Sequence, residues 1–170
     1  MATTGIVRIA IQDRIKIEDC GGNYGSFLDA CYSCYTSFWN SNPTFEGKSL
    51  QRNRNNLRDG KEIDFWGIVD VHDSDAQYPS MERYEKVSLL KYLIENAENS
   101  RDVFFIKRLH QRKVRIEIFS RSELYSMVLQ EIGSTCKKIQ FITAHPISER
   151  QLQKKEKQLL EYTRGRKKPL

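Results

Sequence analysis

The sequence lacks the features that would place the chain in a membrane or on a secretory route. Its apolar runs are far shorter than the roughly 20 residues that cross a bilayer, so we expect no membrane partner. The stretch MATTGIVRIAIQDR has no basic segment followed by an unbroken apolar one, so we predict no secretory signal and a cytoplasmic location. The 170 residues are 39% hydrophobic and 29% charged, a composition typical of one globular domain.

Motifs with a defined chemistry are also missing. The sequence contains no GxxxxGK(S/T), GxGxxG, HExxH or GxSxG, so the common nucleotide-binding, zinc-protease and serine-hydrolase signatures are excluded. The acidic stretch DVHDSD (70–75) offers oxygen ligands, but it lacks the glycine and distal glutamate of an EF-hand. We favour an exposed acidic loop over a one-metal nuclease site here, and we expect no metal and no other cofactor.

Cysteine is scarce, with four residues. Cys31 and Cys34 form a CxxC pair, which is compatible with a redox centre or half of a zinc site. Cys20 and Cys136 are isolated, and no histidine lies near the pair in the sequence. Positions 31 and 34 would share one face of a helix with large apolar side chains, so we predict buried structural cysteines.

Positive charge is concentrated in the C-terminal third. Residues 107–170 contain 16 Lys and Arg against 6 Asp and Glu, a net charge of +10, in a chain whose formal net charge is +6. A basic third on a neutral-to-acidic body indicates a polyanionic partner. A solvated charged helix with a frayed tail would explain residues 149–170 equally well, so both interpretations stay open.

The first half of the chain reads as a strand followed by helices. Apolar residues at odd positions in 6–19 predict a half-buried strand or hairpin. Apolar spacing in 26–40 predicts an amphipathic helix with Ser26 as its N-cap. Residues 41–62 read as a long polar connection, and the apolar run 62–73 favours a short helix over a strand.

The second half reads as a sheet followed by a helix. Arg83 to Lys86 could start a strand, and residues 89–97 look helical. Four apolar segments at roughly ten-residue spacing, from 103 to 145, predict a four-stranded antiparallel meander sheet. Pro146 ends the last strand, and Ser148 with Gln151 forms a capping-box pattern for a basic helix that runs to about Tyr162. This order of elements gives the fold class α+β.

Basic and hydroxyl side chains remain as the candidate site. Metal-free RNA cleavage needs a group that takes the 2′-OH proton, cations that stabilise the charge on phosphorus, and a group that protonates the leaving oxygen. Arginine suits the phosphate because its fork donates two parallel hydrogen bonds, and a histidine titrates near neutral pH. The side chains available are Lys107, Arg108, His110, Arg112, Lys113 and Arg115 on one predicted hairpin, with Thr143 and His145 on the last strand.

Five segments resemble, in order and spacing, the barnase–EndoU–colicin–RelE (BECR) type of small ribonuclease, in particular phage- and plasmid-associated toxins. They are DGKEIDFWGI (59–68), RYEKV with IEN (83–96), the strand RIEIF that Arg115 opens, ITAH (142–145) and LQKKEKQLLEY (152–162). The resemblance covers residues 59–162 and implies a helical part packed on an antiparallel sheet whose concave face binds RNA. Residues 1–58 match nothing in it.

The resemblance also implies site residues. Arg83, Lys86, Arg115, Thr143 and His145 are the candidate catalytic residues by this comparison. Relatives tend to have an aromatic residue at the position of His145, and some have a histidine where this chain has Gly67. The acid–base role is therefore missing, or it is taken by His72, His110 or His145. The candidate RNA-binding residues are Lys107, Arg108, His110, Arg112, Lys113, Lys154 and Lys155.

Together these features predict one α+β domain over residues 1–162, with 1–58 as a possible N-terminal extension, 59–162 as the ribonuclease-like core and 163–170 as a basic tail. The predicted function is a metal-independent endoribonuclease, the toxin of a toxin–antitoxin or phage-defence system, whose partners are RNA and an acidic antitoxin or inhibitor protein. The alternatives are a non-catalytic nucleic-acid-binding protein and a protein–protein interaction module that uses the basic third.

Overall fold

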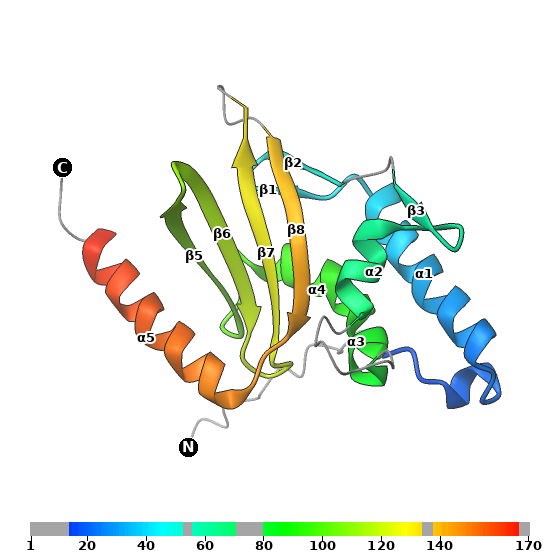
Figure 1. The fold of residues 1–170 in the computed structure, drawn as a ribbon. Coiled ribbons are helices and arrows are strands. Elements are labelled where there is room, and N and C mark those ends of the chain that lie inside the picture. Colours follow the sequence, from blue (N-terminus) through cyan, green and yellow to red (C-terminus); the bar gives the residue numbers. More distant parts are fainter. Residues whose placement is uncertain (1–13, 53–55, 71–79, 134–137, 167–170) are drawn as a thin grey trace, which may run out of the picture.

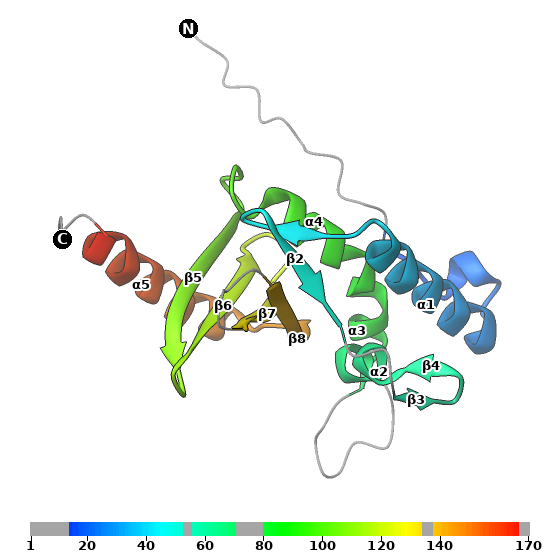
Figure 2. The ribbon, with the colours of Figure 1, turned by 90° about the horizontal axis from the view of Figure 1, so that it is seen from above.

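The computed structural model describes residues 14–52, 56–70, 80–133 and 138–166. Its fold is α+β, as the sequence predicts, and it is built around a curled sheet with strand order β1-β2-β8-β7-β6-β5 (Figures 1 and 2). Helices α1, α2 and α4 pack against one face of this sheet, and α5 packs against the other. The two faces therefore have different neighbours, and this difference positions the candidate site.

The predicted meander is present. It consists of β5 (Val103–His110), β6 (Lys113–Ser120), β7 (Tyr125–Ile132) and β8 (Lys138–Pro146), each antiparallel to the next. Ile116 and Ile118 of β6 are fully buried in the main core, as expected from the alternation of apolar and polar residues along this strand. The last strand ends at Pro146, as predicted.

The predicted polar connection over residues 41–62 is wrong, because it contains short strands. β1 (Thr44–Phe45) and β2 (Lys48–Gln51) extend the sheet, so in the described part of the chain it has six strands rather than four. A second ribbon consists of β3 (Leu57–Arg58) and β4 (Lys61–Glu62). Such strands are too short to show a period-2 pattern, and β2 is fixed by parallel pairing with β8, far along the chain.

The helices of the first half are α1 (Tyr24–Asn40), α2 (Ile63–Val69), α3 (Met81–Glu85) and α4 (Leu89–Asn96), with short 3₁₀ helices at Glu18–Cys20 (η1) and Lys86–Ser88 (η2). The cap of α1 is Asn23, whose side chain accepts a hydrogen bond from the Ser26 N–H at 2.9 Å, so the prediction of Ser26 as the cap is wrong. The helix preferred for 62–73 is confirmed over Ile63–Val69 as α2, and residues 71–73 lie outside the described residues.

Two strand predictions for residues before the meander fail. Arg83 to Lys86 lie in α3 and η2 rather than in a strand. Tyr84, between them, projects from α3 into the main core. Arg14 to Ile17 form no strand, although Ile15 and Ile17 pack against the main core. The rest of the predicted N-terminal strand lies outside the described residues.

The main core joins α1 to the sheet through aromatic and sulfur side chains. Cys31 is fully buried beside Phe27 and Tyr35, which agrees with the prediction of structural cysteines, and burial raises the pKa of its thiol to about 12. Cys34 is only half-buried, so the prediction of a buried residue is wrong at that position. Cys20 is also half-buried, and Cys136 lies outside the described residues. Cys31 is therefore a packing residue rather than a reactive one.

The basic helix α5 (Glu149–Arg166) forms the second layer. Its capping box is confirmed, because the Gln151 N–H donates to Ser148 Oγ at 3.2 Å and the Ser148 N–H donates to Gln151 Oε1 at 2.8 Å. The helix extends beyond Tyr162 into the predicted tail. It is anchored by half-buried Leu152, Leu159 and Tyr162, which pack against Ile106, Phe119 and Ile147.

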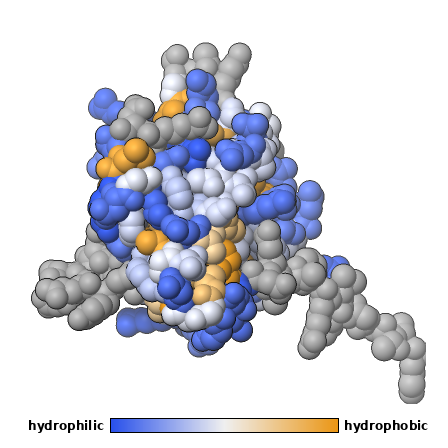
Figure 3. Space-filling view, turned by 90° about the vertical axis from the view of Figure 1, so that its right-hand side faces the viewer, coloured by the Kyte–Doolittle hydropathy of each residue, from blue (hydrophilic) through white to orange (hydrophobic). Residues whose placement is uncertain are grey.

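The surface on the far side from α5 is formed by α1 and the β3–β4 ribbon. Figure 3 shows it as largely hydrophilic, with smaller apolar areas. Within the described ranges, no helix combines the length and the apolar composition needed to cross a bilayer.

Candidate active site

The strand register brings the main predicted site residues to one face of the sheet. Arg108 pairs with Arg115, Val128 pairs with both Glu117 and Thr143, and Ser126 pairs with His145. Side chains of paired residues point to the same face of a sheet. Since the apolar side chains of Ile106 and Phe119 on this face pack against α5, we call it the α5 face.

A β-bulge in β8 puts Thr143 and His145 on the α5 face. Leu129 pairs with Phe141 but Val128 pairs with Thr143, so Ile142 is the extra residue between them. In a regular strand without the bulge, Thr143 would point with Phe141 into the main core, because alternate residues of a strand share a face. The bulge therefore reverses the orientation of the C-terminal half of β8.

Glu117 lies at the centre of the α5 face, bound by three donors. Its Oε1 accepts from the ammonium of Lys155 and from Ser126 Oγ at 3.3 Å, and its Oε2 accepts from Arg108 Nη2 at 2.7 Å. Burial by itself would raise the pKa of Glu117, but the hydrogen bond and charge of Lys155, together with Arg108, outweigh it and lower the pKa. Glu117 is therefore ionised at neutral pH.

Arg115 is a cation of this face that has no counter-charge among the described residues. Its Nε is buried without a hydrogen-bond partner, and within the described ranges its guanidinium forms no ion pair. It lines a hollow of about 350 Å³ together with Arg108, Leu109, His110, Glu117 and Val128. A free guanidinium beside two further nitrogen-bearing side chains makes this hollow suited to an anion.

His145 lies on the same face beside Ser126. Burial lowers the pKa of His145, the positive charges of Lys155 and Arg83 lower it further, and Glu117 opposes them without reversing the direction. The neutral imidazole therefore prevails at pH 7 in the free protein. An anion bound nearby would raise this pKa and favour the protonated form.

Thr143 lies where β8 has no strand neighbour, because β2 pairs only with the other end of β8. Helix α2 covers this part of the strand. The hydroxyl of Thr143 reaches the carbonyl oxygen of Gly67 at 3.5 Å, which is long for an O–H···O bond. The hydroxyl is thus only weakly held by the protein.

Arg83 and Lys86 lie on helices rather than on strands. Arg83 Nη1 donates to the carbonyl oxygen of Asp70 at 2.8 Å, just beyond the C-terminal end of α2, so its first role is structural. Lys86 is buried in η2, packed against α1, α3 and α4, and its Nζ donates to Glu82 at 2.7 Å. The structure does not bring Lys86 to the α5 face, contrary to its predicted position on the sheet.

The predicted RNA-binding residues divide into three groups. Lys107 points to the opposite face from Arg108 and binds Glu46 in the β1–β2 turn. Arg108 and Lys155 both bind Glu117. The others, His110, Arg112 and Lys113 at the β5–β6 turn and Lys154 on α5, are exposed.

Glu117 and Ser126 are the site residues that sequence reasoning missed. The alternation along KVRIEIF already places Glu117 on the face of Arg115, but it gives no reason to separate this carboxylate from an ordinary solvated one. Of the acidic stretch 70–75, only Asp70 is described, and it pairs with Arg58 at 2.7 Å. Residues 71–75, with His72, lie outside the described residues.

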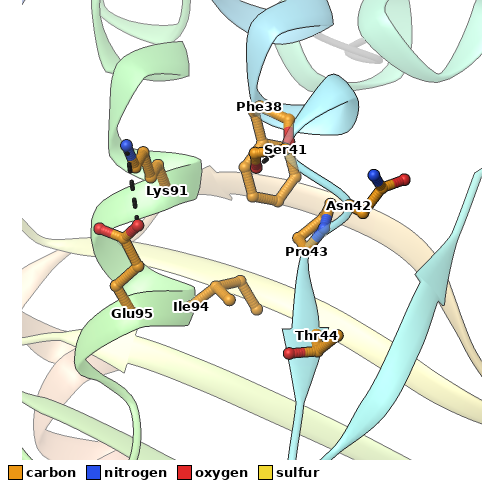
Figure 4. Close-up of a pocket in the computed structure, with 8 residues that line it drawn as sticks. All are labelled: Phe38, Ser41, Asn42, Pro43, Thr44, Lys91, Ile94 and Glu95. Carbon is orange, nitrogen blue, oxygen red and sulfur yellow. Dashed lines mark hydrogen bonds and ion pairs between the residues drawn. The ribbon is translucent and has the colours of Figure 1, made fainter.

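A second hollow, of about 330 Å³, lies between the C-terminal end of α1, β1 and α4 (Figure 4). Its lining includes Phe38, Pro43 and Ile94, and its charged side chains, Lys91 and Glu95, pair with each other at 3.7 Å. Both are close to half-exposed, so this pair is weak. None of the predicted site residues lines this hollow.

No protein-family model, curated protein or solved structure matches this chain. Within the described residues, no three His, Cys, Asp or Glu side chains are close enough together to bind a metal ion. Any functional assignment therefore depends on the side chains of the α5 face.

Proposed function

We propose that the protein is a metal-independent endoribonuclease that cleaves RNA at the α5 face by attack of a 2′-OH on the adjacent phosphodiester. The observation that carries this proposal is the juxtaposition of Arg115, which has no counter-charge and lines a hollow, with the ionised Glu117. Thr143 and His145 share this face. A carboxylate, an imidazole and free cations are the groups that such a reaction requires.

In the proposed reaction the scissile phosphate enters the hollow and is bound by Arg115 and Arg108. The arginine forks stabilise the additional negative charge that develops on the phosphoryl oxygens. Arg108 and Lys155 then divide their hydrogen bonds between the phosphate and Glu117, and this raises the basicity of the carboxylate. The hydroxyl of Thr143 contacts the phosphate or the ribose.

Glu117 takes the proton of the 2′-OH while the O2′–P bond forms. The bond from phosphorus to the 5′-oxygen breaks, and His145, protonated near the bound phosphate, gives its proton to that oxygen. The products are a 2′,3′-cyclic phosphate and a 5′-hydroxyl. Subsequent proton exchange with water restores both residues.

The resemblance to BECR ribonucleases supports a toxin of a toxin–antitoxin or phage-defence system, acting in the cytoplasm. The net charge of +10 over residues 107–170 supports RNA as substrate and an acidic antitoxin or inhibitor protein as partner. Such an inhibitor would cover the α5 face and pair an acidic side chain with Arg115.

The test is incubation with total RNA in EDTA, followed by mapping of the new ends. We expect cyclic phosphates with wild-type protein, loss of cleavage with Glu117→Gln, Arg115→Ala and His145→Ala, and unchanged cleavage with Lys107→Met. Lys107 is the matched control because it neighbours Arg108 in β5 but points to the other face. Intact RNA at high protein concentration would overturn the proposal, and binding without cleavage would favour the nucleic-acid-binding alternative.

A further inference from the structure

The hairpin of β5 and β6 carries basic side chains outward from the hollow along one face. Arg108 and Arg115 form one cross-strand pair, and His110 and Lys113 form the pair nearest the turn. Arg112 lies in the turn itself. Leu109 and the four residues from His110 to Lys113 are exposed, and His110, Arg112 and Lys113 form no ion pair with any described residue.

The turn adopts a backbone conformation that its residues disfavour. Gln111 and Arg112 have φ angles of +48° and +63°, which is the left-handed pair of a type I′ turn. Asn-Gly is the usual sequence at these positions, because other L-residues are strained there. The chain keeps a long cationic side chain at a position where Asn or Gly would be more stable, and this trade indicates a function for the charge.

The spacing of the basic pairs suits the backbone of a nucleic acid strand. Residues two apart on a strand are separated by about 6.8 Å, at about 3.4 Å per residue. This step is similar to the distance between successive phosphates of an extended strand. The pair Arg108 and Arg115 and the pair His110 and Lys113 are one such step apart, and Arg112 lies beyond them in the turn as a third basic position.

We propose that this hairpin is a track for single-stranded RNA, which holds the two phosphates that follow the scissile one. The inference rests on the proposed function and adds to it the substrate class and a minimum length of about three phosphates. A single row of cations follows one backbone, whereas duplex RNA presents two strands and hides its base edges in a deep groove.

The test uses 2′-O-methyl oligonucleotides of two and eight residues, which cannot undergo 2′-OH attack, so binding is measured without cleavage. Fluorescence anisotropy over a range of salt concentrations gives the affinity and its salt slope. For Arg112→Asn we expect roughly threefold to tenfold weaker binding of the eight-residue strand and a salt slope reduced by about 0.7, with unchanged binding of the two-residue strand. Asn is favoured in the turn, so the melting temperature should stay the same or rise.

Gln111→Asn is the matched control, because it relieves the same turn without removing a charge. We expect unchanged affinity and an unchanged salt slope. The proposed track would be overturned if Arg112→Asn had no effect on binding, or if both variants had the same effect. It would also be overturned if duplex RNA bound with the same affinity, or if polyglutamate gave the same salt slope. If the track behaves as expected but RNA stays intact in the cleavage assay, the proposed function fails and the track stands. If RNA is cleaved but Arg112→Asn binds like wild type, only the track fails.

Discussion

Glu117 and Lys155 provide the sharpest test of how α5 is joined to the sheet. Their side chains are only 12% and 13% exposed, so the hydrogen bond between these charged groups is worth about 1.5–3 kcal/mol. Arg108 is 48% exposed, and its bond to Glu117 is therefore limited to about 1 kcal/mol or less. We expect Glu117→Gln to lower the free energy of unfolding by about 2–4 kcal/mol at pH 7, and Lys155→Met by about 1–3 kcal/mol.

The double variant measures the interaction energy between Glu117 and Lys155 separately from their other contacts. If the contact is as described, Glu117→Gln with Lys155→Met should lose about 1.5–3 kcal/mol less than the two single losses added together. Urea unfolding at pH 7 measures the three losses, and in a chain of this size each kcal/mol corresponds to about 2–4 °C in melting temperature. Losses that add to within about 0.5 kcal/mol would refute the argument, since the two side chains would then be independent.

The pH dependence gives a second readout of the same pair. The folded-state pKa of Glu117 lies below its unfolded value of about 4.3, so its contribution to stability is fully present above that value. The contribution is lost as the pH falls through the folded-state pKa. Glu117→Gln should therefore flatten the acid limb of the stability curve, and an unchanged acid limb would contradict the lowered pKa.

Three further outcomes are expected. Since the folded-state pKa of His145 lies below about 6.5, wild-type stability should fall as the pH drops below that value, and His145→Gln should remove this fall. A proton NMR titration of His145 should have its midpoint below 6.5. Gly67→Ala should stabilise by about 0.5–1 kcal/mol, because the position is helical and an added Cβ meets no atom within 4 Å; urea unfolding would show a loss if that space were filled. Arg83→Met should cost about 1–3 kcal/mol through the unpaired carbonyl of Asp70, and a variant as stable as wild type would show that this bond is dispensable.

The sequence by itself determined the elements whose signals are local. The meander from 103 to 146 follows from alternation and turn spacing, and the start of α5 follows from Ser148, Gln151 and the preceding Pro146. Helix α2 was also recoverable from its apolar residues. These signals depend on neighbours within a few positions along the chain, and for that reason they can be read without knowing the fold.

The tertiary structure alone decided which side chains meet. Strand β2 joins the sheet through parallel pairing with β8, and Lys155 reaches Glu117 across 38 residues of sequence. The bulge at Ile142 turns Thr143 and His145 away from the core and onto the face of Arg115. Strand register is fixed by the packing of both faces of the sheet, and one inserted residue reverses every side chain beyond it. That reversal is what makes a candidate site out of residues that the sequence could only list.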